Sequence, residues 1–379
     1  MRIGVPSETG ADETRVALTP SGAEELLEQG FDICVATGAG NDAGHTDESY
    51  RTAGCEIAND RSAVFEQSDI ILHVRGLAAN DPDAPADPYR DGQVIIGQVG
   101  PHQLDEKLDE LAERGISLFA LELTPRISRA QSMDVQSSMD SLSGYRAMTI
   151  AAKELPKMIP MEMTAAGTIR PADVFVLGAG VAGLKAISTS ERLGGRTRAH
   201  DIRPEVKEEV ESLGAEFFAI EEEPEDVADE EGHAKEQEDD FYERQRQMLL
   251  DVVGKSDIMI TTAAVPGGQA PEIISREMIE RMDAGSIVVD IAAAGGGNCA
   301  PTRADETVEI DGVKVLGPTN LPATIPHTAS QLFSSNLVSF LKLLAEDGDL
   351  VIDTDDEIID ATLLTHDGIN REPHRDKEE

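Results

Sequence analysis

Residues 178–183 read Gly178-Ala179-Gly180-Val181-Ala182-Gly183, directly after an apolar run at residues 173–177 and before a stretch with helical periodicity. This order of strand, glycine turn and helix is typical of a dinucleotide-binding fold. The first glycine permits the tight turn, the second lets a pyrophosphate approach the backbone, and the third allows close packing of helix on strand. The helix N–H groups would face the anion. A merely structural turn is the alternative. The residues predicted to contact the cofactor here are Gly178, Gly180, Val181, Ala182 and Gly183.

The acid expected at the adenosine ribose is Asp201, which lies 18 residues beyond the last glycine and ends the next strand-like run, residues 197–201. Its carboxylate can accept hydrogen bonds from both ribose hydroxyls. It would also repel a 2′-phosphate, by about 4 kcal/mol for charges roughly 4 Å apart at intermediate screening. The sequence therefore favours NAD(H) over NADP(H).

Short apolar runs rich in β-branched residues alternate with helix-like stretches along the chain, which predicts an α/β fold with parallel, helix-covered sheets. The second half holds six such runs, the number that a doubly wound dinucleotide fold requires. The expected strands are residues 2–5, 32–36, 69–74, 93–98 and 116–121, then 173–177, 197–201, 216–219, 257–262, 286–291 and 313–316.

We expect two Rossmann-like, doubly wound parallel-sheet domains, separated by a cleft and joined by long helices. A long helical pattern at about residues 133–155 divides the halves, and a helix at residues 330–344 leads a C-terminal segment that should return to the first domain. Because open α/β sheets bind ligands outside the carboxyl ends of their strands, NAD is expected in the cleft. The first domain is expected over residues 1–133 plus about 330–379, and the NAD(H)-binding domain over residues 134–329.

Composition narrows the function classes. The 379 residues include 73 acidic and 32 basic side chains, for a net charge of −41, which argues against a nucleic-acid partner and suggests a surface adapted to high salt. Cys34, Cys55 and Cys299 are widely spaced, and the eight histidines form no ligand pattern, which favours a reduced, cytoplasmic compartment and no metal. No apolar run is long enough to span a membrane.

Residues 221–240 contain 12 acidic side chains in 20 positions and should be mobile. A solvated excursion and a functional lid are both open interpretations of this segment.

The loop at residues 125–134 follows the strand expected at residues 116–121. A nicotinamide carboxamide has one acceptor oxygen and two donor hydrogens, so Arg126 and Asp134 together could satisfy it in one orientation. Fixing the carboxamide fixes the ring face that presents the hydride. Gln131 is neutral and two-sided, which suits a bridge to a second ligand. The competing interpretation is that the arginine and aspartate pair or cap the following helix.

Several stretches resemble the NAD(H)-binding domain I of proton-translocating nicotinamide nucleotide transhydrogenase, and the match covers nearly the entire chain. The opening segments, residues 2–8 and 15–20, are shared with the related alanine dehydrogenases and do not separate the two. The stretches that carry the resemblance are residues 125–134, 137–147, 178–183, 201–206, 261–263 and 296–299.

The resemblance implies roles for particular residues. Arg126, Gln131 and Asp134 would form the family's Arg-Gln-Asp loop, which orients the nicotinamide, with Gln131 reaching toward NADP(H) on another subunit. Asp201 corresponds to the ribose acid, and residues 221–240 to a loop that closes over bound nucleotide. The family has a tyrosine in that loop where this chain has His233, which leaves closure open. The further residues implied at the cofactor are Ser137, Ile202, Arg203, His233 and Ala263.

The resemblance also implies partners. Hydride would pass from NADH bound here to NADP⁺ on a separate NADP(H)-binding subunit, coupled to proton movement through a membrane-spanning subunit. The expected assembly contains a homodimer of this chain. Because the chain ends in a hydrophilic tail where fused relatives continue into membrane helices, we expect a cytoplasmic subunit that docks at the inner face of the membrane through its partners.

Two alternatives remain. An amino-acid dehydrogenase needs an arginine, a lysine and a histidine converging on the substrate. Arg15 is present, but His73 stands at the lysine position and His102 falls a few residues from the catalytic histidine, so these residues default to structural or surface roles. An NAD-sensing module is disfavoured because sensing requires no residue facing a second nucleotide.

Overall fold

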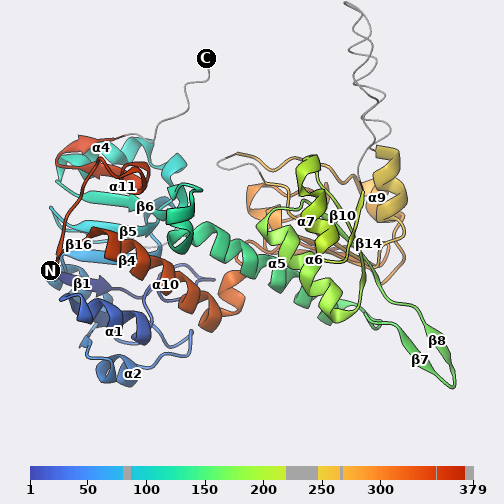
Figure 1. The fold of residues 1–379 in the computed structure, drawn as a ribbon, viewed down its shortest axis with the longest axis horizontal. Coiled ribbons are helices and arrows are strands. Elements are labelled where there is room, and N and C mark those ends of the chain that lie inside the picture. Colours follow the sequence, from blue (N-terminus) through green and yellow to red (C-terminus); the bar gives the residue numbers. More distant parts are fainter. Residues whose placement is uncertain (80–86, 219–245, 265–267, 347, 372–379) are drawn as a thin grey trace, which may run out of the picture. The chain divides into compact units, whose positions relative to one another are not determined.

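The computed structural model describes residues 1–79, 87–218, 246–264, 268–346 and 348–371. The chain divides into two compact units, Met1–Met139 with Pro322–Glu379, and Asp140–Leu321. Each unit contains one large sheet covered by helices (Figure 1). The assignment of functions to these units stays a prediction. The acidic segment at residues 221–240, with His233, lies outside the described residues.

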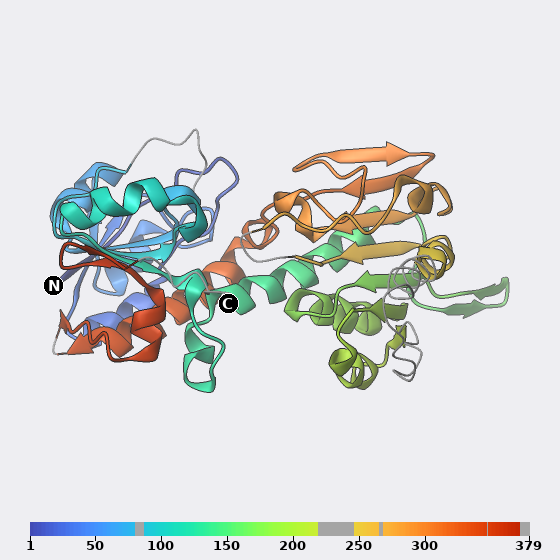
Figure 2. The same cartoon turned by 90° about the horizontal axis from the view of Figure 1, so that it is seen from above.

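Unit 1 is built on an eight-stranded sheet in the order β19-β18-β6-β5-β4-β1-β2-β3 (Figure 2). Strands β1 to β6 are parallel and follow the doubly wound order 3-2-1-4-5-6, so the α/β prediction is confirmed. The strands are β1 (Arg2–Val5), β2 (Asp32–Ala36), β3 (Glu56–Ala58), β4 (Ile70–Arg75), β5 (Val94–Gln98), β6 (Ser117–Ala120), β18 (Leu363–His366) and β19 (Ile369–Asn370).

Helices cover both faces of this sheet because successive strand side chains point to opposite sides. On one face Gly4 leaves room for Val64 of α3, and on the other Phe119 packs edge-on against Phe340 of α10, with ring centroids 5.4 Å apart. The helices of this unit are α1 (Pro20–Glu28), α2 (Asp47–Thr52), α3 (Arg61–Gln67), α4 (Asp105–Glu113), α10 (Pro326–Leu344) and α11 (Glu357–Thr362).

Unit 2 carries a seven-stranded sheet in the order β11-β10-β9-β12-β13-β15-β14. The six expected strands are present and parallel to their neighbours, whereas β14 is an antiparallel edge strand that the sequence pattern did not predict. The strands are β9 (Asp173–Leu177), β10 (Arg196–His200), β11 (Glu216–Phe218), β12 (Ile258–Thr261), β13 (Ile287–Asp290), β14 (Thr307–Ile310) and β15 (Val313–Leu316).

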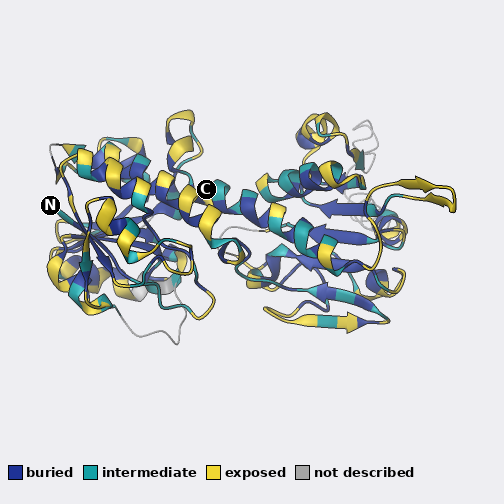
Figure 3. Ribbon diagram, turned by 90° about the horizontal axis from the view of Figure 1, so that it is seen from below, coloured by how far each residue is buried: buried dark blue, intermediate teal, exposed yellow. Residues whose placement is uncertain are grey.

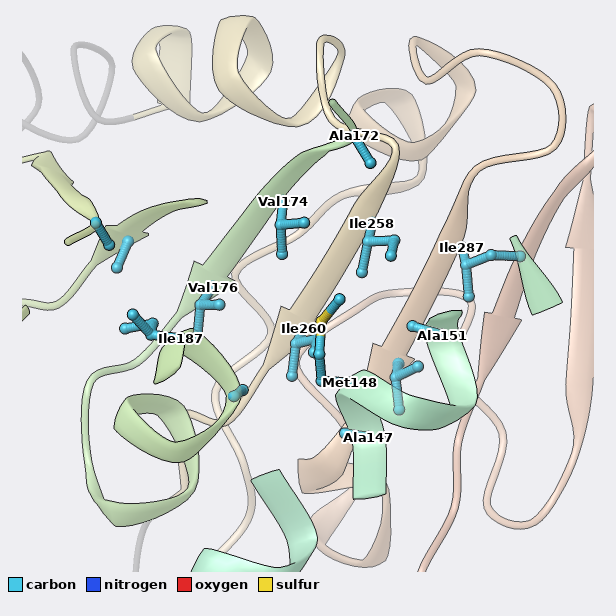
Figure 4. Close-up of a cluster of buried hydrophobic side chains, with 14 of the residues drawn as sticks. Ala147, Met148, Ala151, Ala172, Val174, Val176, Ile187, Ile258, Ile260 and Ile287 are labelled. Carbon is cyan, nitrogen blue, oxygen red and sulfur yellow. The ribbon is translucent and has the colours of Figure 1, made fainter. Parts of the chain in front are cut away.

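The core of unit 2 follows strand alternation. Val174 and Val176 of β9 pack with Met148 and Ile187 on one face of the sheet (Figure 4), while Phe175 faces the opposite cluster. The first face is covered by α5 and α6, and the second by residues 246–253 and α9. The helices are α5 (Val135–Glu154), α6 (Val181–Leu193), α7 (Lys207–Ser212) and α9 (Arg276–Glu280), and residues 246–253 are also helical.

The hairpin of β7 (Glu162–Thr164) and β8 (Gly167–Ile169) was not anticipated, because it has no apolar core face to leave a pattern in the sequence. All residues from 161 to 170 are exposed, including Met163 at 68 % and Ile169 at 49 % (Figure 3). An isolated two-stranded hairpin is at best marginally stable in water. Its exposed apolar side chains therefore lack a partner within the described chain.

Candidate functional site

Two glycines of the turn after β9 are required by the fold of unit 2 itself. Gly178 has a φ of +94°, and a Cβ there would lie 2.5 Å from the hydroxyl oxygen of Thr262. A Cβ on Gly183 would lie 1.9 Å from the carbonyl oxygen of Gly178, so α6 can pack this close only with glycine. These positions produce the tight turn and the close helix approach that the sequence predicts.

Gly180 differs from both, because nothing in the protein requires it to be glycine. Its backbone is extended, with φ −76° and ψ −168°, and an added Cβ would meet no atom within 4 Å. The turn therefore presents bare main chain to open space directly at the N-terminus of the 13-residue helix α6. Val181 is exposed and Ala182 is half-buried at this helix start. Such an arrangement fits a dinucleotide pyrophosphate, which needs close backbone approach and helix N–H donors.

Asp201 follows β10 and is bonded back to the glycine turn. Its Oδ2 accepts a hydrogen bond from the main-chain N–H of Ala179 at 2.7 Å, and its Oδ1 accepts one from the N–H of Arg203 at 2.9 Å. Burial raises the pKa of the Asp201 carboxyl, but hydrogen bonds from Arg203 and Ala179 outweigh it, so the pKa is lowered overall. The carboxylate thus stays ionised beside the turn, as a ribose ligand must.

The two residues after Asp201 are more open. Ile202 is 83 % exposed, which leaves an apolar side chain uncovered next to the turn. Arg203 is half-exposed and donates from Nε and Nη2 to the two Asp201 oxygens, both at 3.0 Å. Ile202 could cover an adenine ring, while Arg203 is engaged by the carboxylate.

The topological switch of the unit 2 sheet lies between β9 and β12, where doubly wound folds bind ligands. There the hydroxyl of Thr262 donates to the carbonyl oxygens of Leu177 and Gly178 at 3.3 and 3.2 Å. Ala263 is held by Asn298, whose amide accepts from its N–H at 3.0 Å and donates to its carbonyl at 2.7 Å. The loop that contains Ala263 is therefore fixed against the glycine turn.

Asp290, which the sequence pattern did not single out, organises this edge of the sheet. It is completely buried at the end of β13 and accepts five hydrogen bonds at 2.7 to 3.2 Å. One signal was available, since Asp290 ends an expected strand just as Asp201 does. The donors are the N–H groups of Ala292, Asn298 and Cys299 and the hydroxyls of Thr261 and Thr302.

The loop at residues 125–134 belongs to unit 1 and combines anchored with free side chains. Ala130 and Met133 are buried, and the carbonyl of Ser132 accepts a hydrogen bond from Asn336 of α10 at 2.8 Å. In contrast, the exposed side chains of Arg126 and Gln131 make no hydrogen bond or ion pair with any described residue. A rigid backbone thus presents a cation and a neutral amide that are available for ligands.

Asp134 fits the capping interpretation, since it precedes α5 and both its oxygens accept from Ser137, from the N–H at 2.8 Å and the hydroxyl at 2.6 Å. This role leaves further lone pairs on each oxygen, because an ionised carboxylate offers about four acceptor positions. Capping and ligand binding are compatible at this residue.

The structure thus brings together the glycine turn, Asp201, Ile202, Arg203 and Ala263 in unit 2. Arg126, Gln131, Asp134 and Ser137 share one segment of unit 1. No group of three or more histidine, cysteine or acidic side chains in the described ranges could hold a metal ion. Within the same ranges, no helix has the length and apolar character of a membrane span.

The residues of the amino-acid dehydrogenase alternative are occupied or apart. Arg15 is buried and paired with Glu13, from Nη2 at 2.6 Å and Nε at 2.7 Å. His73 is enclosed, and its Nε2 lies 3.0 Å from the Tyr89 hydroxyl. His102 is exposed on the turn Pro101–Gln103. His73 and Arg15 are thus structural here.

Comparison with known proteins gives a consistent result. Residues 4–143 match the family model "Alanine dehydrogenase/PNT, N-terminal domain" and residues 147–372 match "Alanine dehydrogenase/PNT, C-terminal domain". The first of the chains that form NAD(P) transhydrogenase subunit alpha in Rhodospirillum rubrum is 40 % identical over 372 residues, 97 % of each chain. Alanine dehydrogenase of Mycobacterium tuberculosis is 26 % identical over 375 residues, 97 % of this chain and 94 % of its own.

Solved structures agree with these relatives. The crystal structure of transhydrogenase from Sinorhizobium meliloti superposes with a TM-score of 0.86 at 39 % identity, covering 98 % of this chain and 100 % of that one. Both halves of the chain match the same family, in sequence and in fold. The chain therefore belongs to the alanine dehydrogenase/PNT family.

Proposed function

We propose that this chain is the NAD(H)-binding subunit of a proton-translocating NAD(P) transhydrogenase. It binds NADH and transfers hydride to NADP⁺ held on a separate subunit. The observation that carries the proposal is the open space at Gly180, a glycine that only a closely approaching ligand explains. The relatives named as transhydrogenase subunits, at about 40 % identity over nearly the full chain, support this function over amino-acid oxidation.

In this proposal each group of residues has one task. The bound nucleotide supplies the hydride from its nicotinamide ring. The glycine turn and the N–H groups of α6 bind its pyrophosphate, and Asp201 binds its adenosine ribose. Arg126 and Asp134 orient the carboxamide, with Ser137 nearby, so that hydride leaves from one ring face. Hydride transfer needs no proton donor, which agrees with a loop that contains Arg126 and Gln131 but no histidine.

The proposed partners are the NADP(H)-binding subunit, a membrane-spanning proton-channel subunit and a second copy of this chain. The chain would work in the cytoplasm and associate with the inner face of the membrane through those partners.

The function is tested by supplying each set of substrates to the purified chain. We expect no turnover of alanine with NAD⁺, or of pyruvate and ammonia with NADH, when the chain is alone. Adding an NADP(H)-binding subunit should allow hydride exchange between the two nucleotides. Efficient amino-acid turnover without a partner would support the alanine dehydrogenase alternative instead.

Gln131→Asn should slow hydride transfer while leaving NADH affinity nearly unchanged. The substitution keeps the amide but shortens the side chain by one methylene, and a misplacement of about 1 Å can cost roughly 100-fold in rate. Stopped-flow mixing with an NADP(H)-loaded partner measures the rate, and titration with NADH alone provides the control. Equal rates for the two proteins would reject a bridging role for Gln131.

The β7–β8 hairpin is the proposed contact between two copies of the chain. Its apolar residues Met161, Met163 and Ile169 are exposed, and a second copy would cover them. Met163→Glu should shift the dimer toward monomer, because a carboxylate would have to be buried in an apolar contact. Light scattering after size exclusion measures the mass. Thr164→Glu, a change at an exposed polar position of the same strand, is the matched control.

The hairpin proposal fails if Met163→Glu and the wild type show the same mass across a dilution series. It also fails if both substitutions dissociate the dimer equally, since general charge and not the apolar contact would then be responsible.

A further inference from the structure

The Asp201 carboxylate already has all of its acceptor positions filled. Its Oδ2 accepts from the Ala179 N–H at 2.7 Å and from Arg203 Nη2 at 3.0 Å. Its Oδ1 accepts from the Arg203 N–H at 2.9 Å and from Arg203 Nε at 3.0 Å. Because an ionised carboxylate offers about four lone-pair positions, a ribose diol can bind only after one or two of these donors leave.

The four donors differ in how easily they can leave. The N–H groups of Ala179 and Arg203 belong to the main chain of the turns after β9 and β10, so their positions are set by the fold. The guanidinium belongs to a side chain that is 48 % exposed, whereas the Asp201 side chain is only 7 % exposed. Water can replace the carboxylate as partner of the guanidinium. Binding of the ribose should therefore displace the Arg203 side chain.

A displaced guanidinium next to a ribose is a phosphate ligand of the right geometry. Arginine presents its N–H groups as a planar fork that matches phosphate oxygens, and an arginine beside the ribose is how related folds accommodate a 2′-phosphate. In this chain the fork is instead paired with a carboxylate that would itself repel a 2′-phosphate. The same ion pair thus opposes NADP(H) in two ways.

We propose that Arg203 is a latent ligand for a 2′-phosphate, and that the Asp201–Arg203 pair sets the nucleotide specificity of the site. The inference rests on the proposed dinucleotide site. Removing the Asp201 carboxylate alone should then convert the site from one that rejects NADPH to one that binds it through Arg203.

Other charges near the guanidinium do not change the comparison. Besides Asp201, the carboxylates of Glu205 and Glu209 act on Arg203 and contribute to its raised pKa. Both would weaken phosphate binding. Because they are present in every variant considered below, their effect cancels from the differences between variants.

The test is a double-mutant cycle of wild type, Asp201→Ala, Arg203→Ala and the double variant, each titrated with NADH and with NADPH by calorimetry. Asp201→Ala should weaken NADH binding by about 10- to 100-fold and strengthen NADPH binding by about tenfold, the effect of one hydrogen bond to a charged group. The gain for NADPH should disappear in the double variant. Arg203→Ala should bind NADH as tightly as wild type or more tightly, since it removes the competing donor.

Two outcomes would overturn the inference. Equal NADPH affinity in Asp201→Ala and in the double variant would show that Arg203 is not the phosphate ligand. A fall in NADH affinity of Arg203→Ala to the level of Asp201→Ala would show that the guanidinium is required and not displaced. Thermal unfolding of each variant, and the isosteric Asp201→Asn, separate loss of binding from loss of folding. Wild type that binds no NADH would instead refute the proposed function.

Discussion

Replacing Gly180 by valine should abolish measurable NADH binding, with at least a 100-fold loss of affinity, while the protein stays folded. The backbone at Gly180 is extended and the space around it is open, so a branched side chain enters without a clash. The poorer helix cap costs about 1 kcal/mol and is offset by the smaller entropy of the unfolded chain. The valine methyl groups would nevertheless occupy the position of the pyrophosphate and remove its charge-assisted hydrogen bonds.

Gly183→Ala is the matched comparison, because it adds one carbon on the other side of the same turn. That carbon would lie 1.9 Å from the Gly178 carbonyl oxygen, which is main chain and cannot move aside alone. We expect a loss of about 3 kcal/mol in the free energy of unfolding. Urea unfolding and NADH titration of both variants separate the two roles. If Gly180→Val destabilised the protein as much as Gly183→Ala, the open space at Gly180 would not be the binding site.

Asp290→Ala should be the most destabilising substitution at the switch point of the sheet. It leaves three main-chain N–H groups and two threonine hydroxyls without their buried acceptor. Loss of a buried, hydrogen-bonded carboxylate costs on the order of 3–5 kcal/mol, which lowers the melting temperature of a unit this size by roughly 10 °C. NADH affinity should fall as well, since Asn298 would no longer hold Ala263 in place.

Differential scanning calorimetry of the full chain measures this effect. Asp290→Asn should be intermediate, because its amide can still accept from one set of donors and the threonine hydroxyls can reverse direction. Glu280→Ala removes an exposed carboxylate paired with Arg276 and should change stability by less than about 0.5 kcal/mol. Equal melting temperatures for Asp290→Ala and Glu280→Ala would contradict the organising role of Asp290.

The sequence predicted the parts of the fold that are written locally. Apolar runs located the parallel strands of both sheets, and the glycine spacing located the turn after β9. The antiparallel edge strands β14, β18 and β19 were not predicted, because an edge strand is short and half-exposed and leaves a weak pattern. The β7–β8 hairpin was missed because it has no buried face at all.

The candidate site divides in the same way. Gly180 and Asp201 could be identified because the turn and the acid stand at fixed spacing from a strand. The network around Asp290 and Asn298 could not, since it joins residues of separate strands that only the folded sheet brings together. At Asp134 the two interpretations of one residue do not exclude each other, because capping a helix leaves acceptor capacity unused.

The place of β18 in the first sheet has a consequence for biosynthesis. This strand comes from residues 363–366 but pairs with β6, more than 240 positions earlier in the chain. The ribosome therefore delivers every residue of unit 2 before unit 1 can be closed. Until then the nascent chain carries β6 as an open strand edge, the kind of surface that pairs with other chains and that chaperones shield.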